Sequence, residues 1–147
     1  MPDSEAEKLF ASGLQALAGN NTLTALVLFE KALAKEERPI FSSYMAFCIA
    51  KERGQFQLAV TLCEKAIARE PQNPLHYLNL GKIYLFAGKK SEAVRTFREG
   101  LARESNQHII EELDKLETRK PPVFSFLDRD NPINRLLGIV LKKLGFR

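Results

Sequence analysis

The amino-acid sequence predicts an all-α fold built from three consecutive antiparallel helix pairs. The main evidence is a set of columns in which similar residues recur at an interval of 34 positions. These columns are Ala25, Ala59 and Ala93; Ala32, Ala66 and Gly100; and Phe29, Cys63 and Phe97. A period of this length is typical of proteins that stack one supersecondary unit repeatedly. The composition, 45% hydrophobic and 27% charged over 147 residues, is that of a globular chain able to bury a core.

Each period has the pattern of two amphipathic helices joined by a short turn. Small residues seven positions apart, such as Ala25 and Ala32, lie on one face of the second helix and let neighbouring helices approach closely. The turn column holds Asn20, Gly54 and Gly88, where the chain reversal requires a residue that tolerates positive φ. We expect helices near residues 4–18, 22–36, 40–53, 56–70, 74–87 and 91–104.

Start signals support three of these helices. Ser4-Glu5-Ala6-Glu7 is a capping-box start, in which a serine side chain and a glutamate three residues later bond to each other's backbone. The third helix follows Pro39, and the fifth follows Asn73-Pro74, an N-cap with proline at the first helical position.

The third unit resembles the tetratricopeptide repeat family. Tyr77-Leu78-Asn79-Leu80-Gly81-Lys82-Ile83-Tyr84, followed by Ala93 and Phe97, fits the family's aromatic-x-x-Leu-Gly-x-x-Tyr…Ala-x-x-x-Phe pattern. The resemblance implies a right-handed superhelical α-solenoid with units at about 6–39, 40–73 and 74–107. The first unit has Ser12 where the family has leucine, and the second has Phe47 in the column of Gly13 and Gly81. Phe47 should therefore change how the first helix of the second unit packs.

A stacked array needs a helix that covers its last pair. Residues 108–120 supply a candidate capping helix, with Ile109, Leu113 and Leu116 along one face. Pro121-Pro122 then ends the helix, and residues 121–131 are expected to form an extended linker.

Residues 132–145 predict a further amphipathic helix. Its apolar stripe comprises Ile133, Leu136, Leu137, Val140, Leu141 and Leu144. We expect this stripe to dock on the chain's own repeats or on a sister copy, with a partner protein or a membrane surface as the alternatives. Seven basic and two acidic residues from Thr118 onward give this end a net charge of +5, against −1 for the first 117 residues. The amino-acid sequence of the tail also resembles the tails of some bacterial repeat proteins.

The resemblance also implies that the first helix of each unit lines a concave groove. The residues expected to contact a ligand there are Phe10, Leu14, Tyr44, Cys48, Leu78, Asn79, Lys82 and Phe86. The family's binders of chaperone tails clamp a terminal carboxylate with Lys, Asn and Arg. Phe10 and Leu14 stand where the first unit would supply the lysine and asparagine of that clamp, so we expect apolar anchoring instead, with Asn79 and Lys82 fixing the register.

No pattern for catalysis, a metal or a cofactor stands out in the sequence. His76 and His108 lack the spacing of metal ligands, and we expect both on helix surfaces. Cys63 falls in a packing column and is expected to be a core thiol, whereas Cys48 is expected to line the groove. Two cysteines cannot make a disulfide framework, and the acidic N-terminus lacks the features of a secretory signal, so we expect a cytoplasmic protein.

Together these features predict a non-catalytic scaffold or adaptor that binds a peptide or helix of another protein in the groove, without specific contact to nucleic acid. The C-terminal helix is a candidate plug for that groove. The alternatives are a homodimer assembled by exchange of this helix, or attachment of the basic tail to a membrane surface or polyanion.

Overall fold

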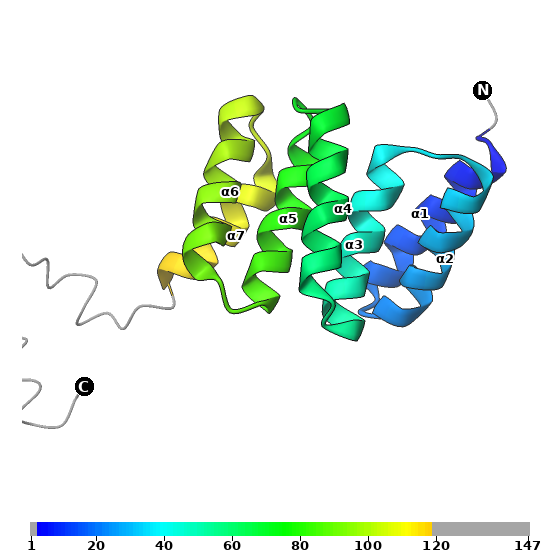
Figure 1. The fold of residues 1–147 in the computed structure, drawn as a ribbon, viewed down its shortest axis with the longest axis horizontal. Coiled ribbons are helices and arrows are strands. Elements are labelled where there is room, and N and C mark those ends of the chain that lie inside the picture. The colour runs from blue at the N-terminus through cyan, green and yellow to red at the C-terminus, as the bar shows by residue number, and fades with distance from the viewer. Residues whose placement is uncertain (1–2, 119–147) are drawn as a thin grey trace, which may run out of the picture. The chain divides into compact units, whose positions relative to one another are not determined.

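The structure, a computed structural model, describes residues 3–118 and is all-helical over that range. Its helices are α1 (Glu5–Ala18), α2 (Thr22–Lys35), α3 (Pro39–Arg53), α4 (Phe56–Arg69), α5 (Pro74–Phe86), α6 (Lys90–Arg103) and α7 (Gln107–Thr118). The boundaries of the first six lie within one residue of those expected from the sequence. In Figure 1 successive helices run in opposite directions and pair as α1 with α2, α3 with α4 and α5 with α6.

The capping and turn signals act as the sequence predicts. The Ser4 hydroxyl accepts from the Glu7 amide at 3.1 Å, and the Ser4 amide donates back to the Glu7 carboxylate at 3.0 Å. Proline stands at the start of α3 and of α5, where its missing N–H has no intrahelical partner to lose. Asn20, Gly54 and Gly88 all have positive φ, at 59°, 64° and 75°, so the turn column is confirmed.

The core is built from the columns that recur at 34 residues. Ala25, Ala59 and Ala93 are fully buried, as are Phe29, Cys63 and Phe97. A Cβ placed on Gly13 would lie 2.3 Å from Cε1 of Phe29, and one placed on Gly81 would lie 2.1 Å from Cε1 of Phe97. The glycines of the first and third units therefore let a phenylalanine of the second helix pack flat against the first helix.

The second unit packs differently at these two columns. Phe47 takes the glycine column and Cys63 the phenylalanine column, and the two side chains belong to different core clusters. Phe47 is 9% exposed and packs into the cluster that contains Ala25, Leu26 and Phe29 of α2. The large ring is thus carried by the first helix of this unit, which confirms that its packing differs.

The described residues fall into two compact units that divide after Ile110. The first turn of α7 belongs to the first unit: Ile109 is fully buried, and its Cδ1 atom lies 3.0 Å from where a Cβ on Gly100 would be. The expected linker at 121–131 and helix at 132–145 lie outside the described residues. Within residues 3–118, no helix is long and apolar enough to cross a membrane.

Candidate protein-binding face

The face formed by α1, α3 and α5, the first helices of the three pairs, carries the residues predicted to bind a ligand; we call it the first-helix face. Five of the eight reach the surface at least in part: Phe10, Leu14, Tyr44, Lys82 and Phe86. Phe86 is the most exposed apolar member, at 41%.

The other three predicted contact residues are buried, and their expected place on the binding surface is corrected here. Cys48 is 0%, Asn79 1% and Leu78 3% exposed. The reason is that α3 and α5 pack against each other, and α5 is also covered by α4 and α6. Asn79 faces inward and donates from Nδ2 to the Ser43 hydroxyl at 3.3 Å, so its amide serves the interior.

An aromatic cluster joins α1, α2 and α3 at one end of this face. The Phe10 ring centroid lies 5.5 Å from that of Phe29, 4.9 Å from that of Phe41 and 5.5 Å from that of Tyr44, which it meets edge-on. Such tilted and edge-to-face pairs are favourable aromatic geometries. Burial raises the pKa of the Tyr44 phenol, so this residue stays neutral and acts as an apolar ring with a polar tip.

A second aromatic pair joins α3 to α5. The ring centroids of Phe47 and Phe86 are 5.5 Å apart, and Nζ of Lys82 lies 5.4 Å from the centroid of Phe47, within cation–π range. Phe47 was missing from the predicted contact set. The signal that could have placed it here was the large side chain in a column otherwise held by glycine.

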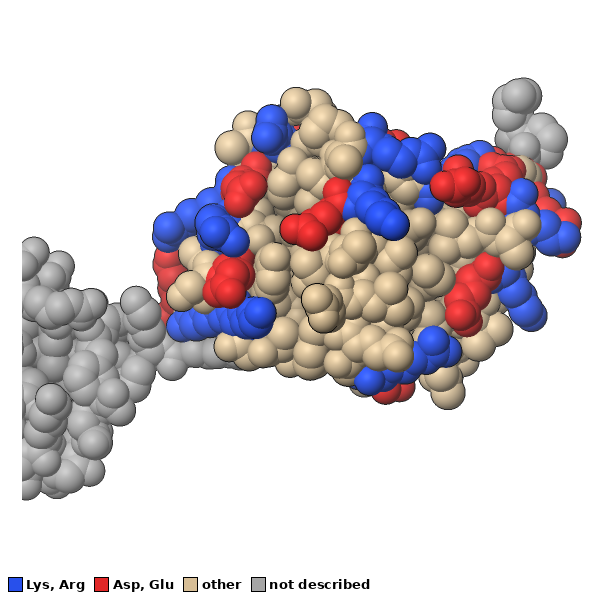
Figure 2. Space-filling view, in the orientation of Figure 1, with Lys and Arg blue, Asp and Glu red and all other residues tan. Residues whose placement is uncertain are grey.

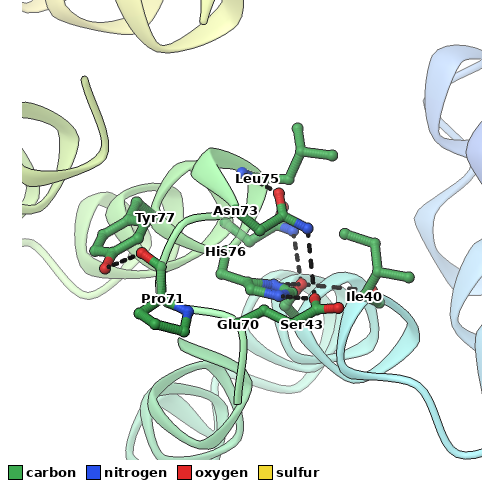
Figure 3. A network of polar contacts seen from close by, with 9 residues as sticks. Ile40, Ser43, Glu70, Pro71, Asn73, Leu75, His76 and Tyr77 are labelled. Atoms are coloured by element: carbon green, nitrogen blue, oxygen red, sulfur yellow. Dashed lines mark hydrogen bonds and ion pairs between the residues drawn. The ribbon is translucent and has the colours of Figure 1, made fainter. Parts of the chain in front are cut away.

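A polar network joins α3, α5 and the end of α4 and is drawn in Figure 3; its Ser43 and His76 are completely buried, whereas the Glu70 side chain is 43% exposed. Nδ1 of His76 is 2.9 Å from the Ser43 hydroxyl, and Nε2 is 2.7 Å from Oε1 of Glu70. The Ser43 hydroxyl also lies 3.4 Å from the carbonyl oxygen of Ile40. His76 is completely buried, so its expected position on a helix surface is wrong. The physical reason is that its partners are Ser43 on α3 and Glu70 at the end of α4. Position 43 holds a serine where the other two units have the larger Leu9 and Tyr77.

Serine, histidine and glutamate are also the members of a hydrolytic triad, but here the serine and the histidine are enclosed. Ser43 and His76 are both 0% exposed, and the Ser43 oxygen already contacts His76, Asn79 and Ile40. A nucleophile must reach a substrate carbonyl, and a completely buried hydroxyl with three protein partners cannot. The network therefore holds α3 and α5 together.

The cysteines are equally enclosed. Burial raises the pKa of the Cys48 thiol to about 12, and that of the fully buried Cys63 is raised further. Both therefore remain protonated thiols near neutral pH, and Cys63 is confirmed as a core residue. Among residues 3–118, no three His, Cys, Asp or Glu side chains gather in a way that could hold a metal ion.

Exposed apolar side chains also occur on the second helices. Leu23 and Val27 on α2 are 59% and 43% exposed, and Leu58 on α4 is 47% exposed. Figure 2 shows a broad uncharged stretch of surface with the acidic and basic side chains spread around it. Since Glu92 and Arg95 occupy the columns of Leu58 and Val27 in the third unit, the fold itself does not require apolar residues at these positions.

Comparison with known proteins finds the same repeat and the same fold in other chains. A family model described as tetratricopeptide repeat matches residues 50–111. The tetratricopeptide domain of Sgt2 from Aspergillus fumigatus superposes with a TM-score of 0.63 at 22% identity, covering 82% of this chain and 87% of that one. The first such domain of Spaghetti (RPAP3), bound to an HSP90 peptide, gives a TM-score of 0.59 at 20% identity, covering 78% and 92%.

A putative pentatricopeptide repeat-containing protein of Arabidopsis thaliana is 32% identical over 80 residues, which is 51% of this chain and 19% of the relative. The chain thus spans about a fifth of the length of that relative. The structural neighbours at this level of identity establish the fold. Together with the family match over residues 50–111 and the columns at 34 residues, they show that the helix pairs of this chain have the tetratricopeptide-repeat fold.

Proposed function

We propose that this chain is a non-catalytic protein-interaction module, a scaffold or adaptor whose first-helix face forms a groove for a peptide or helix of another protein. The observation that carries the proposal is the row of aromatic side chains left partly exposed on α1, α3 and α5, namely Phe10, Tyr44 and Phe86. It is supported by the similar domain of Spaghetti (RPAP3), which is bound to a peptide.

The chemistry of the face favours a ligand with apolar anchors. Burying an apolar side chain contributes about 1.5–3 kcal/mol, so each anchor that the face buries adds to the affinity. Phe10 and Leu14 occupy the positions at which a carboxylate clamp needs a lysine and an asparagine. Lys82 places a positive charge beside the Phe47 ring, where an acceptor or an acidic group of the ligand would be favoured.

The test compares two exposed residues of similar size on different faces. Peptides selected from a display library against the full chain are titrated by calorimetry into the wild type, Phe86→Ser and Leu58→Ser. Phe86→Ser should weaken binding at least about tenfold, a loss of about 1.4 kcal/mol. Leu58, similarly exposed but on α4, serves as the control and should leave the Kd unchanged. Binding that is lost in Leu58→Ser and retained in Phe86→Ser would reject the first-helix face.

For the C-terminal segment we propose that the predicted helix at 132–145 competes with the partner for this face. Six large apolar residues on one stripe are costly to leave in water, and the groove offers them cover. In a Leu137→Asp, Leu141→Asp double variant, the selected peptides should therefore bind more tightly than to the wild type. Unchanged or weaker binding would reject the plug without affecting the proposal for the face itself.

Two other roles of the tail give different results. If it assembles a homodimer, the mass measured by light scattering depends on concentration for the full chain and not for a version that ends at Lys120. If its net charge of +5 attaches the chain to anionic vesicles or another polyanion, binding falls steeply as salt is raised.

A further inference from the structure

The second and third helix pairs meet at a histidine that is bonded through both ring nitrogens. His76 belongs to α5, Ser43 to α3, and Glu70 caps the end of α4. The ring is 0% exposed, and its two contacts, at 2.9 Å to Ser43 and 2.7 Å to Glu70, link all three elements. Every proton at this junction can be assigned from the chemistry of the groups.

With a neutral ring, the arrangement has one consistent set of hydrogen bonds. An ionised carboxylate only accepts, so Nε2 of His76 carries the proton and donates it to Glu70. Nδ1 then has only a lone pair, and the Ser43 hydroxyl must donate to it. Asn79 donates to the Ser43 oxygen in turn, so the hydroxyl uses its one proton and accepts one.

With a protonated ring, the same heavy atoms support a second set. Nδ1 now donates to the Ser43 oxygen, which still accepts from Asn79 and therefore has both lone pairs occupied. The Ser43 proton turns to the carbonyl oxygen of Ile40, 3.4 Å away. Rotation of a single hydroxyl is enough to pass from one set to the other, although the new bond to Ile40 is the longer one.

We propose that His76 and Ser43 form a proton-sensitive joint that holds the second and third repeats together when the ring is neutral and loosens them when it is protonated. The proposal concerns the stability of the array and holds whichever ligand the first-helix face binds.

The surroundings of the His76 ring determine whether its pKa is raised or lowered in the folded protein. Glu70 is the ionisable group that contacts the ring; α3 contributes Ser43, and α4 contributes the Cys63 thiol, whose Sγ lies 3.8 Å from the Ser43 carbonyl oxygen. On α5 itself, the Tyr77 hydroxyl donates to the carbonyl oxygen of Pro71. Arg69, next to Glu70, pairs with Glu37 at 3.5 Å. Burial lowers the pKa of His76, and the nearby Glu70 opposes this only in part.

The sign of the pH dependence follows from linkage. The folded ring takes up a proton less readily than the unfolded one, whose pKa is about 6.5. The contribution of the neutral His76 ring to the free energy of unfolding is therefore complete above about pH 6.5. It falls as the pH drops from that value toward the lower pKa of the folded state. For one proton, the unfolding equilibrium constant rises by at most about tenfold per pH unit in this window.

The experiment follows the unfolding of the full chain in urea at pH 8, 7, 6 and 5, for the wild type, His76→Gln and His108→Gln. The chain has two histidines, so His108→Gln is the matched control. The wild type and His108→Gln should lose stability between pH 7 and 5, and His76→Gln should lose less over the same range. An equal loss in all three proteins, or no loss in the wild type, would overturn the proposal.

A second measurement keeps the proposal testable if His76→Gln does not fold. The ring protons of the two histidines are followed by NMR against pH in the wild type, Glu70→Gln and Glu37→Gln. The midpoint of His76 should lie below about 6.5, should fall further in Glu70→Gln because the carboxylate charge is lost, and should not move in Glu37→Gln. A His76 midpoint at or above that value, or one that Glu70→Gln leaves unchanged, would contradict the joint.

Discussion

The contact between glycine and phenylalanine in the third repeat makes a sharp prediction for Gly81→Ala. The added Cβ would lie 2.1 Å from Cε1 and 2.5 Å from Cδ1 of Phe97, a ring that is completely buried. The ring must therefore move by about an ångström in a close-packed interior.

Two effects of opposite sign determine how much Gly81→Ala changes the free energy of unfolding. Replacing glycine by alanine inside a helix contributes about 1 kcal/mol of stability. Overpacking a core position costs about 1–3 kcal/mol, and the observed overlap puts this site toward the upper end. We expect Gly81→Ala to destabilise the protein by about 1–2 kcal/mol. Gly19→Ala is the control, since its Cβ would meet nothing closer than 3.7 Å and its φ of −85° is ordinary.

A double-mutant cycle isolates the contact itself. In Phe97→Met the thioether can bend away from a new methyl group at position 81, because it is unbranched and flexible. Gly81→Ala should then be neutral or stabilising in the Phe97→Met background, which gives a coupling energy of about 1–3 kcal/mol between the two positions. Free energies from urea unfolding, measured for the four proteins at one pH, provide the cycle. Equal effects of Gly81→Ala in both backgrounds would refute the steric explanation of the glycine column.

Other predictions concern the N-cap of α1, the Phe47 side chain and the Cys48 thiol. Ser4→Ala removes the bond from the Glu7 amide to the Ser4 hydroxyl, while the backbone amide at position 4 can still donate to the Glu7 carboxylate; the change should cost about 1 kcal/mol in urea unfolding, with Ser4→Thr retaining most of that stability. Phe47→Ala should cost about 3 kcal/mol or more, whereas truncation of its more exposed neighbour Phe86 should cost clearly less; similar costs would contradict the central place of Phe47. Because burial raises the pKa of Cys48 to about 12, iodoacetamide at pH 8 should label the folded chain about a thousandfold more slowly than the unfolded chain, and rapid labelling before unfolding would disprove its enclosure.

The helices and the core columns could be predicted from sequence because both depend on local rules. Caps, proline and residues that tolerate positive φ fixed the ends of the helices, and the interval of 34 residues fixed which positions pack in each pair. Phe47 could be recognised as an exception for the same reason, because it is a large side chain in a column that the other two units fill with Gly13 and Gly81.

The candidate site was predicted less well because burial depends on neighbours that are distant in the sequence. Asn79 and Cys48 were placed on the face by analogy between repeats, whereas the packing of α3 on α5 encloses them. His76 lies 33 positions from Ser43, and no local pattern joins them. The available signal was Ser43 itself, a polar residue in the column of Leu9 and Tyr77, which implied a buried partner for its hydroxyl.

The ring pair of Phe47 and Phe86 has a consequence for the order of the repeats. Phe47 is held on one side by the second helix of the preceding unit and on the other by Phe86 of the following unit. A permuted chain that exchanged the second and third units would separate these rings and leave Phe47 facing a neighbour without its counterpart. The repeats are therefore not interchangeable modules, because the Phe47–Phe86 contact between neighbouring units favours one order of units along the chain.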